Sequence, residues 1–275
     1  FPGLFSGSYT FPSYAALAAS TPSRYRQSFA GPGTTGPTTR PNNYEYGAFI
    51  QDDWRASRAL TLNFGLRYDY QVIAKPPITN PNSALISRGL DTGFRPEDKN
   101  NLAPRIGLSF AFNDKTVLRG GYGLFYGRTP AIMTGTAHSQ NGIQVVAIDI
   151  NCTATPTLCP VYPNIFSAVP TGATLAPVNL YLFSSNYSQP FTEQGRLQFE
   201  REVFKNYTFA VRYTLFRGNS LTRTRNVNLS SPVPTVYPVF DSTGVPTGQS
   251  LTVLRFSNPR PISAFQRISR FESTA

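Results

Sequence analysis

Few residues in this 275-residue chain have the types and spacing that catalysis requires. Asp52 and Asp53 are adjacent carboxylates, but neighbouring side chains in an extended strand point to opposite faces, so they cannot act on one substrate as acid and base. His138, the only histidine, lies in "TAHSQNG" without a Cys, Asp or Glu at ligand spacing, which predicts a solvated loop residue. With one histidine and no G-x-S-x-G motif, no nucleophilic triad can be assembled. We therefore expect no enzyme activity, no metal site and no cofactor.

The two cysteines, Cys152 and Cys159, lie close together in "NCTATPTLCP". Two thiols and one histidine cannot supply the four ligands of a usual zinc site. The spacing instead predicts a disulfide across a small loop in an oxidising compartment, and a pair of free thiols is the alternative. The stretch "RGGYGLFYG" is similar to a phosphate-binding glycine loop, but Tyr126 replaces its third glycine and no helix pattern follows.

Arginines recur on polar positions along the chain, and they are the residues best placed to bind a solute. They are Arg67, Arg105, Arg119, Arg196 and Arg212. One interpretation is a basic lining that attracts anionic solutes or contacts the carboxylates of a plug domain. The other, which we favour, is ion pairing across strands with Asp69, Glu200 and similar neighbours. The net charge is +11, but the basic residues are scattered without a run of five, so we expect no nucleic-acid partner.

An alternating pattern of apolar and polar residues defines the elements that carry these arginines. In "NFGLRYDY", residues 63–70, aromatic and aliphatic side chains share one parity while Asn, Gly, Arg and Asp share the other. The same alternation predicts strands at 44–54, 60–70, 101–112, 116–127, 193–203 and 207–218. These strands are longer than those of most soluble sheets and are close to the span of a tilted transmembrane strand.

The connections between these strands alternate in length. Short turns at 55–59, 113–115 and 204–206 are followed by long segments at 71–100, 128–192 and from 219 onward. This asymmetry is typical of an outer-membrane barrel with periplasmic turns and extracellular loops, whose apolar positions face lipid and whose polar positions face the lumen. The segment 128–192 is the best candidate for ligand contact. The alternative is a soluble β-sandwich, in which the apolar rows would pack together in a dry core.

Three stretches resemble a known family. They are "YGAFIQDDWRASRALTLNFGLRYDY", "NNLAPRIGLSFAFNDKTVLRGGYGLFYG" and "EQGRLQFEREVFKNYTFAVRYTLFRGNSLTRTRNVN". Together they resemble the barrel of TonB-dependent receptors, in particular the Oar-like members that carry a carboxypeptidase-regulatory-like domain ahead of the plug. The resemblance covers all six predicted strands, and its most specific part is the "QDDWR...LTLNFGLRYDY" hairpin.

The resemblance implies an all-β, antiparallel, 22-stranded transmembrane β-barrel in the bacterial outer membrane, closed by a plug and energised through the TonB complex. Residues 1–275 contain no plug, TonB box or regulatory-like domain, so we expect a partial barrel of about six to eight meandering strands with long extracellular loops. The implied function is uptake of a bulky ligand, with outer-membrane lipid, lipopolysaccharide and, through the missing plug, the TonB complex as partners. A non-transporting structural or adhesion barrel is the alternative, and a soluble β-sandwich binding domain is a third.

Overall fold

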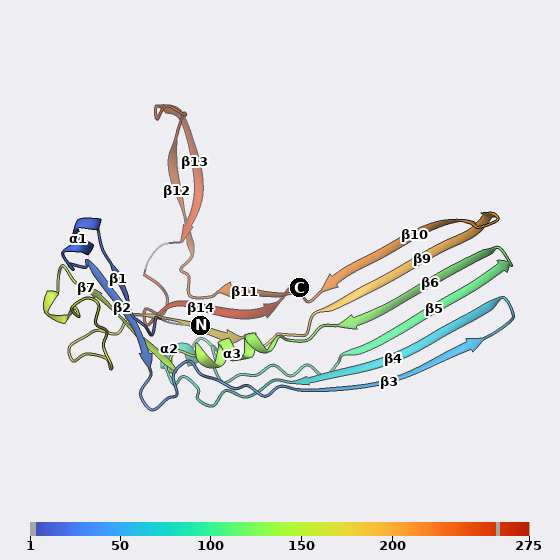
Figure 1. The fold of residues 1–275 in the computed structure, drawn as a ribbon, viewed down its shortest axis with the longest axis horizontal. Helices are drawn as coiled ribbons and strands as arrows, with labels where there is room; N and C mark the ends of the chain where they lie inside the picture. Colours follow the sequence, from blue (N-terminus) through green and yellow to red (C-terminus); the bar gives the residue numbers. More distant parts are fainter. Residues whose placement is uncertain (1–3, 257–258, 275) are drawn as a thin grey trace.

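The computed structural model describes residues 4–256 and 259–274, and its largest element is a six-stranded sheet. The strands are β3 (Tyr44–Arg55), β4 (Leu60–Val72), β5 (Leu102–Asn113), β6 (Thr116–Tyr126), β9 (Phe191–Phe204) and β10 (Tyr207–Asn219). They are antiparallel and follow one another in the order β10-β9-β6-β5-β4-β3 (Figure 1). Each predicted strand matches an observed one to within two residues at either end, because the alternation of polar and apolar side chains continues over the whole strand.

The two ends of this sheet differ. Short turns join β3 to β4, β5 to β6 and β9 to β10 at what we call the inner ends. The long segments leave from the opposite, outer ends and fold together there as one region (Figure 1). We call residues 4–43, 73–101, 127–190, 220–256 and 259–274 the loop region. The alternation of short and long connections predicted from the sequence is therefore present in three dimensions.

The strand register keeps the two parities on separate faces across all six strands. Ile50 lies opposite Leu66, and Phe64 lies opposite Ile106. We call this the apolar face. Its exposed members are Tyr44, Tyr46, Ile50, Trp54, Phe64, Leu66, Tyr68, Leu102, Ile106, Leu108, Phe112, Tyr122, Leu197, Val203, Tyr207, Phe209, Val211, Tyr213 and Leu215. The opposite face, which carries the predicted arginines, is called the polar face.

In the part of the chain that the structure describes, the apolar face is exposed rather than packed against other segments. Ile50 is 73% exposed and Tyr213 is 66% exposed, so these rows are not the dry core that a β-sandwich requires. An exposed apolar surface of this extent is unusual in a soluble protein and is the ordinary outer surface of a sheet that faces lipid. The soluble β-sandwich alternative is therefore wrong. Among the described residues, no helix is both long and apolar enough to cross a membrane.

The buried cores lie in the loop region. One core surrounds Tyr25 and Ile148, in a sheet of β1 (Ser8–Thr10), β2 (Arg24–Ala30) and β7 (Val145–Asn151), next to α1 (Tyr14–Ala18). The sulfur atoms of Cys152 and Cys159 are joined in a disulfide at the edge of this core, across the short 3-10 helix η1 (Pro156–Leu158).

A second part of the loop region contains two further cores. It is built on a sheet of β11 (Thr222–Asn226), β14 (Phe265–Ser273) and β8 (Val178–Phe183), with α2 (Ser83–Ile86) and α3 (Ala131–Ser139) nearby. The cores centre on Leu180 and on Phe271. A separate hairpin, β12 (Pro232–Phe240) and β13 (Pro246–Phe256), projects away from the other loops (Figure 1).

The loop region contains strands that the sequence pattern did not predict. The six strands of the large sheet agree with the six to eight meandering barrel strands that we expected. The long segments, which were predicted only as loops, contain eight more strands among the described residues, and β8 pairs with β14 in parallel. The additional strands escaped detection because many of them are short or lack a clean alternation. For example, "VNLYLF" in β8 is buried on both sides near its end, so its hydrophobicity does not alternate.

Candidate functional site

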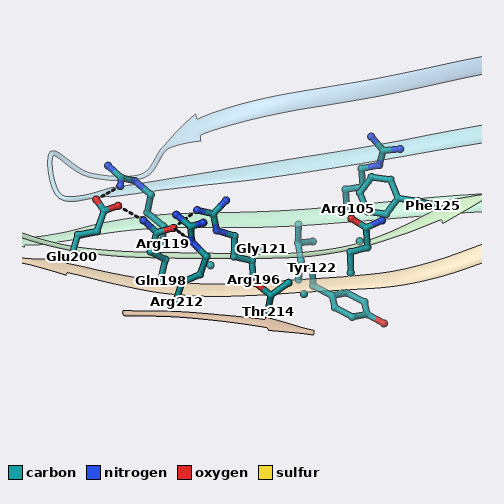
Figure 2. Close-up of a pocket in the computed structure, with 15 residues that line it drawn as sticks. Arg105, Arg119, Gly121, Tyr122, Phe125, Arg196, Gln198, Glu200, Arg212 and Thr214 are labelled. Atoms are coloured by element: carbon teal, nitrogen blue, oxygen red, sulfur yellow. Dashed lines mark hydrogen bonds and ion pairs between the residues drawn. The ribbon is translucent and has the colours of Figure 1, made fainter. Parts of the chain in front are cut away.

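Four of the five predicted arginines meet on the polar face. Arg105, Arg119, Arg196 and Arg212 line one hollow of about 720 Å³ that runs over β5, β6, β9 and β10. Figure 2 shows Arg119, Arg196 and Arg212 gathered around Gln198, with Arg105 farther along beside Phe125. The fifth, Arg67, lines a neighbouring hollow nearer the outer ends.

Cross-strand register places these side chains together. Arg119 of β6 lies opposite Gln198 of β9, and Gln198 lies opposite Arg212 of β10. Gly123 lies opposite Arg105, and a Cβ atom at position 123 would lie 2.9 Å from the Cγ of that arginine. Glycine there leaves the space in which Arg105 lies, which gives the glycine-rich stretch of β6 a structural role.

The five arginines have different partners. Arg119 of β6 pairs with Glu200 of β9, as the prediction of ion pairs across strands requires. Arg67 pairs with Asp69 at 2.7 Å, but both residues lie on β4, so this ion pair is within one strand. The guanidinium of Arg105 lies 4.2 Å from the centroid of the Phe125 ring, a cation–π contact that accounts for an aromatic residue on the polar face. Arg196 and Arg212 both donate to Oε1 of Gln198, the latter at 3.0 Å. In the described part of the chain, these last two form no ion pair.

A buried polar network that the sequence did not reveal joins the outer ends of four strands. The side chain of Gln71, at the end of β4, donates to the carbonyl of Thr129 and accepts from its N–H. Gln189, which precedes β9, donates to Gln71 at 2.8 Å and accepts from Asn101, which precedes β5, at 2.7 Å. Hydrogen bonds between buried polar groups favour one arrangement, so we infer that this network attaches the loop region to the sheet. Within the described residues, Oδ1 of Asn101 is the one oxygen of the network without a partner. Four isolated polar residues that flank strands carry no recognisable signal in the sequence.

The segment 128–192, predicted to contact ligand, is folded rather than open. It contains α3, β7, η1 and β8, and the Cys152–Cys159 disulfide lies in it. The prediction that His138 is solvated is wrong, because His138 lies in α3 and is 5% exposed. Its Nε2 donates to the carbonyl of Ala74 at 3.1 Å, and burial lowers the pKa of the imidazole. A lone histidine among small residues gives no sign of such packing.

The loop region also contains a charged cluster that the sequence pattern did not predict. The carboxylate of Glu272 in β14 is 4% exposed and pairs with Arg223, Arg225 and Arg270 at 2.8 to 2.9 Å. Hydrogen bonds from Arg225, and then from Arg270 and Arg223, lower the pKa of Glu272 to about 2 against the opposing effect of burial. This cluster connects β11 to β14.

The remaining candidates for chemistry stay apart. Asp52 lies opposite Phe64, whereas Asp53 accepts a hydrogen bond from Asn63, so the two carboxylates belong to different faces of β3. Over residues 4–256 and 259–274, no three His, Cys, Asp or Glu side chains are grouped in a way that could hold a metal ion. The arginine-lined hollow is therefore the site with the clearest chemistry, which is the binding of negatively charged groups.

Comparison with known proteins agrees with the architecture. Residues 2–275 match the family model described as "Outer membrane beta barrel domain". A search of curated proteins found no match. The family match covers nearly the whole chain, the long strands carry an exposed apolar face, and the long connections gather at one end. We conclude that this chain belongs to the outer membrane beta barrel domain family and is located in the bacterial outer membrane.

Proposed function

We propose that the chain forms part of the barrel wall and the outer loops of a TonB-dependent receptor that takes up a bulky ligand. The observation that carries the proposal is the internal order of the loop region. Its segments form hydrophobic cores of their own and are joined to four strand ends by the network around Gln71. Binding residues concentrate on loops that a rigid scaffold holds in place.

The free edges of the sheet support a larger barrel. In the part of the chain that the structure describes, β3 and β10 each pair with only one strand. Open sheet edges do not occur in hydrocarbon, because their N–H and C=O groups have no partners there. Further strands must therefore pair with β3 and β10 in the membrane. This requirement is compatible with the 22-stranded barrel of the Oar-like receptors that the sequence resembles.

The two faces of the sheet define the expected partners. The apolar face would contact outer-membrane lipid and the acyl chains of lipopolysaccharide, and the polar face would contact the plug or a ligand in the lumen. The TonB complex would act through the plug. We propose no catalytic activity.

A non-transporting adhesion barrel is the second candidate, and the β12–β13 hairpin favours it. The hairpin stands apart from the other loops (Figure 1), with Val236 62% exposed and Leu254 63% exposed. Because an isolated two-stranded hairpin is marginally stable in water, these side chains are suited to contact another surface.

Engagement of TonB discriminates the two candidates without knowledge of the ligand. The full-length gene product, expressed in its own outer membrane, is treated with a cross-linker and probed for a covalent adduct with TonB. A receptor gives an adduct that disappears when its plug domain is deleted. A heat-modifiable barrel in the outer membrane that gives no adduct would refute energised transport and favour adhesion.

A further inference from the structure

We propose that the hollow on the polar face is a binding site for an anionic solute, with Arg196 and Arg212 as its primary contacts. The inference deepens the proposed function and rests on it, because the polar face must line an aqueous lumen for a solute to reach the site. The class of ligand is a molecule that carries carboxylate or phosphate oxygens.

The first argument is the unused hydrogen-bonding capacity of these two arginines. A guanidinium has five N–H donors. In the described residues, Arg196 and Arg212 each use one donor, and both use it on the same atom, Oε1 of Gln198. Gln198 is buried, its Oε1 already accepts two hydrogen bonds, and its amide nitrogen is a donor that bonds Glu200, so it cannot accept further from either arginine. The remaining donors of both side chains are free to contact a ligand in the hollow.

The second argument is electrostatic. Two guanidinium groups that share one neutral oxygen repel each other, and no carboxylate pairs with either of them in the residues that the structure describes. The hollow is lined by four arginines and by one carboxylate, Glu200, which is already paired with Arg119. An anion placed between Arg196 and Arg212 would relieve this repulsion and form charge-assisted hydrogen bonds, the strongest that a guanidinium makes.

The third argument is the shape of the hollow. Its volume of about 720 Å³ falls within the range of small-molecule sites. Thr214 adds a hydroxyl group beside Arg196, and Arg105 stacks on Phe125 toward the outer ends (Figure 2). A solute that entered from the loop region would therefore meet Arg105 first and then the Arg196–Arg212 pair.

Binding of two defined anions to the full-length receptor in detergent micelles tests the proposal. Propane-1,2,3-tricarboxylate and tripolyphosphate serve as probes, and isothermal titration calorimetry at low and high salt measures their affinity. The two probes separate carboxylate from phosphate ligands. We expect at least one of them to bind, with an affinity that falls as salt is added because the interaction is electrostatic.

Three variants assign the binding to this hollow. Arg196→Gln and Arg212→Gln should each weaken binding by about tenfold, since each removes a charged hydrogen-bond donor. Glu200→Gln removes the only carboxylate of the lining and should strengthen binding by about threefold, a gain that misfolding cannot imitate. Arg201→Gln is the matched control, because Arg201 lies on the same strand with its side chain on the opposite face, and it should leave the affinity unchanged.

The outcomes separate this proposal from the proposed function. A receptor that cross-links to TonB but binds neither anion would overturn the anion site and leave the transport proposal standing. Anion binding that depends on Arg196 and Arg212, in a protein that does not engage TonB, would support the site and refute energised transport. Equal affinity in the wild type and the Arg196→Gln/Arg212→Gln double variant would also overturn the site.

Discussion

Replacing Glu272 with glutamine should loosen the sheet that β8, β11 and β14 form in the loop region. The carboxylate is almost fully buried and receives hydrogen bonds from Arg223, Arg225 and Arg270. Glutamine keeps the shape and one acceptor oxygen but removes the negative charge. Three positively charged groups would then remain close together without a counterion, in the register that pairs β11 with β14.

The pKa of Glu272 gives the size of the effect. A decrease from the ordinary 4.5 to about 2 corresponds to about 3 kcal/mol of stabilisation at neutral pH. Arg223 and Arg225 are 57% and 53% exposed, so solvent screens part of this interaction and we expect a loss of about 2 kcal/mol. Because the pKa is lowered in the folded state, the stabilisation is complete above pH 4.5. It is lost as the pH falls toward 2.

Hydrogen exchange measured by mass spectrometry can detect this change in the full-length protein. A loss of about 2 kcal/mol should accelerate exchange of the β11 and β14 amides about thirtyfold at pH 7. Glu97→Gln is the control, since Glu97 also pairs with two cations, Arg95 and Lys99, but is 42% exposed. Its replacement should leave exchange of the neighbouring amides close to the wild-type rate, because exposed ion pairs contribute little to stability.

Two results would refute this reasoning. Exchange in β11 and β14 that is the same in the Glu272→Gln variant and the wild type would show that the cluster contributes no stability. A difference in thermal stability between the two proteins that persists unchanged at pH 2 would show that the lost carboxylate charge is not its cause.

Three further predictions concern other parts of the chain. Leu197→Arg places a charge near the middle of the apolar face and should lower the free energy of unfolding by about 2–4 kcal/mol, measured by urea unfolding from a bilayer. Thr61→Arg, on the polar face, should change the free energy of unfolding by less than about 0.5 kcal/mol. Cys152→Ser opens the small disulfide loop and should lower local stability by about 2 kcal/mol, and thiol reagents should label the wild-type cysteines only after reduction. Burial lowers the pKa of His138 below 6.5, so the imidazole binds a proton more readily when the segment is unfolded. The segment around α3 should therefore become more sensitive to protease as the pH falls from 7 to 5, and His138→Gln should abolish this pH dependence.

Local sequence pattern was sufficient for the barrel strands because their environment repeats every two residues. In β4, for example, the apolar residues face lipid and the polar residues face the lumen, so the residue type indicates the face. The loop region has no such repeat. The residues that organise it, such as Gln71 and Asn101, lie far apart in the chain and take their roles from neighbours that the fold supplies.

Three properties of the large sheet could be predicted from the amino-acid sequence: its antiparallel strands, the separation of an apolar from a polar face, and the end at which the long connections gather. These properties follow from side-chain alternation and segment length, which are local. Which charged side chains lie close together depends on the pairing of strands in three dimensions. Arg119 and Glu200 are 81 positions apart, and Arg196 and Arg212 converge on Gln198 because β9 lies beside β10 in one register. A shift of that register by one residue would turn these side chains toward the opposite face, so the hollow depends on strand pairing that alternation does not specify.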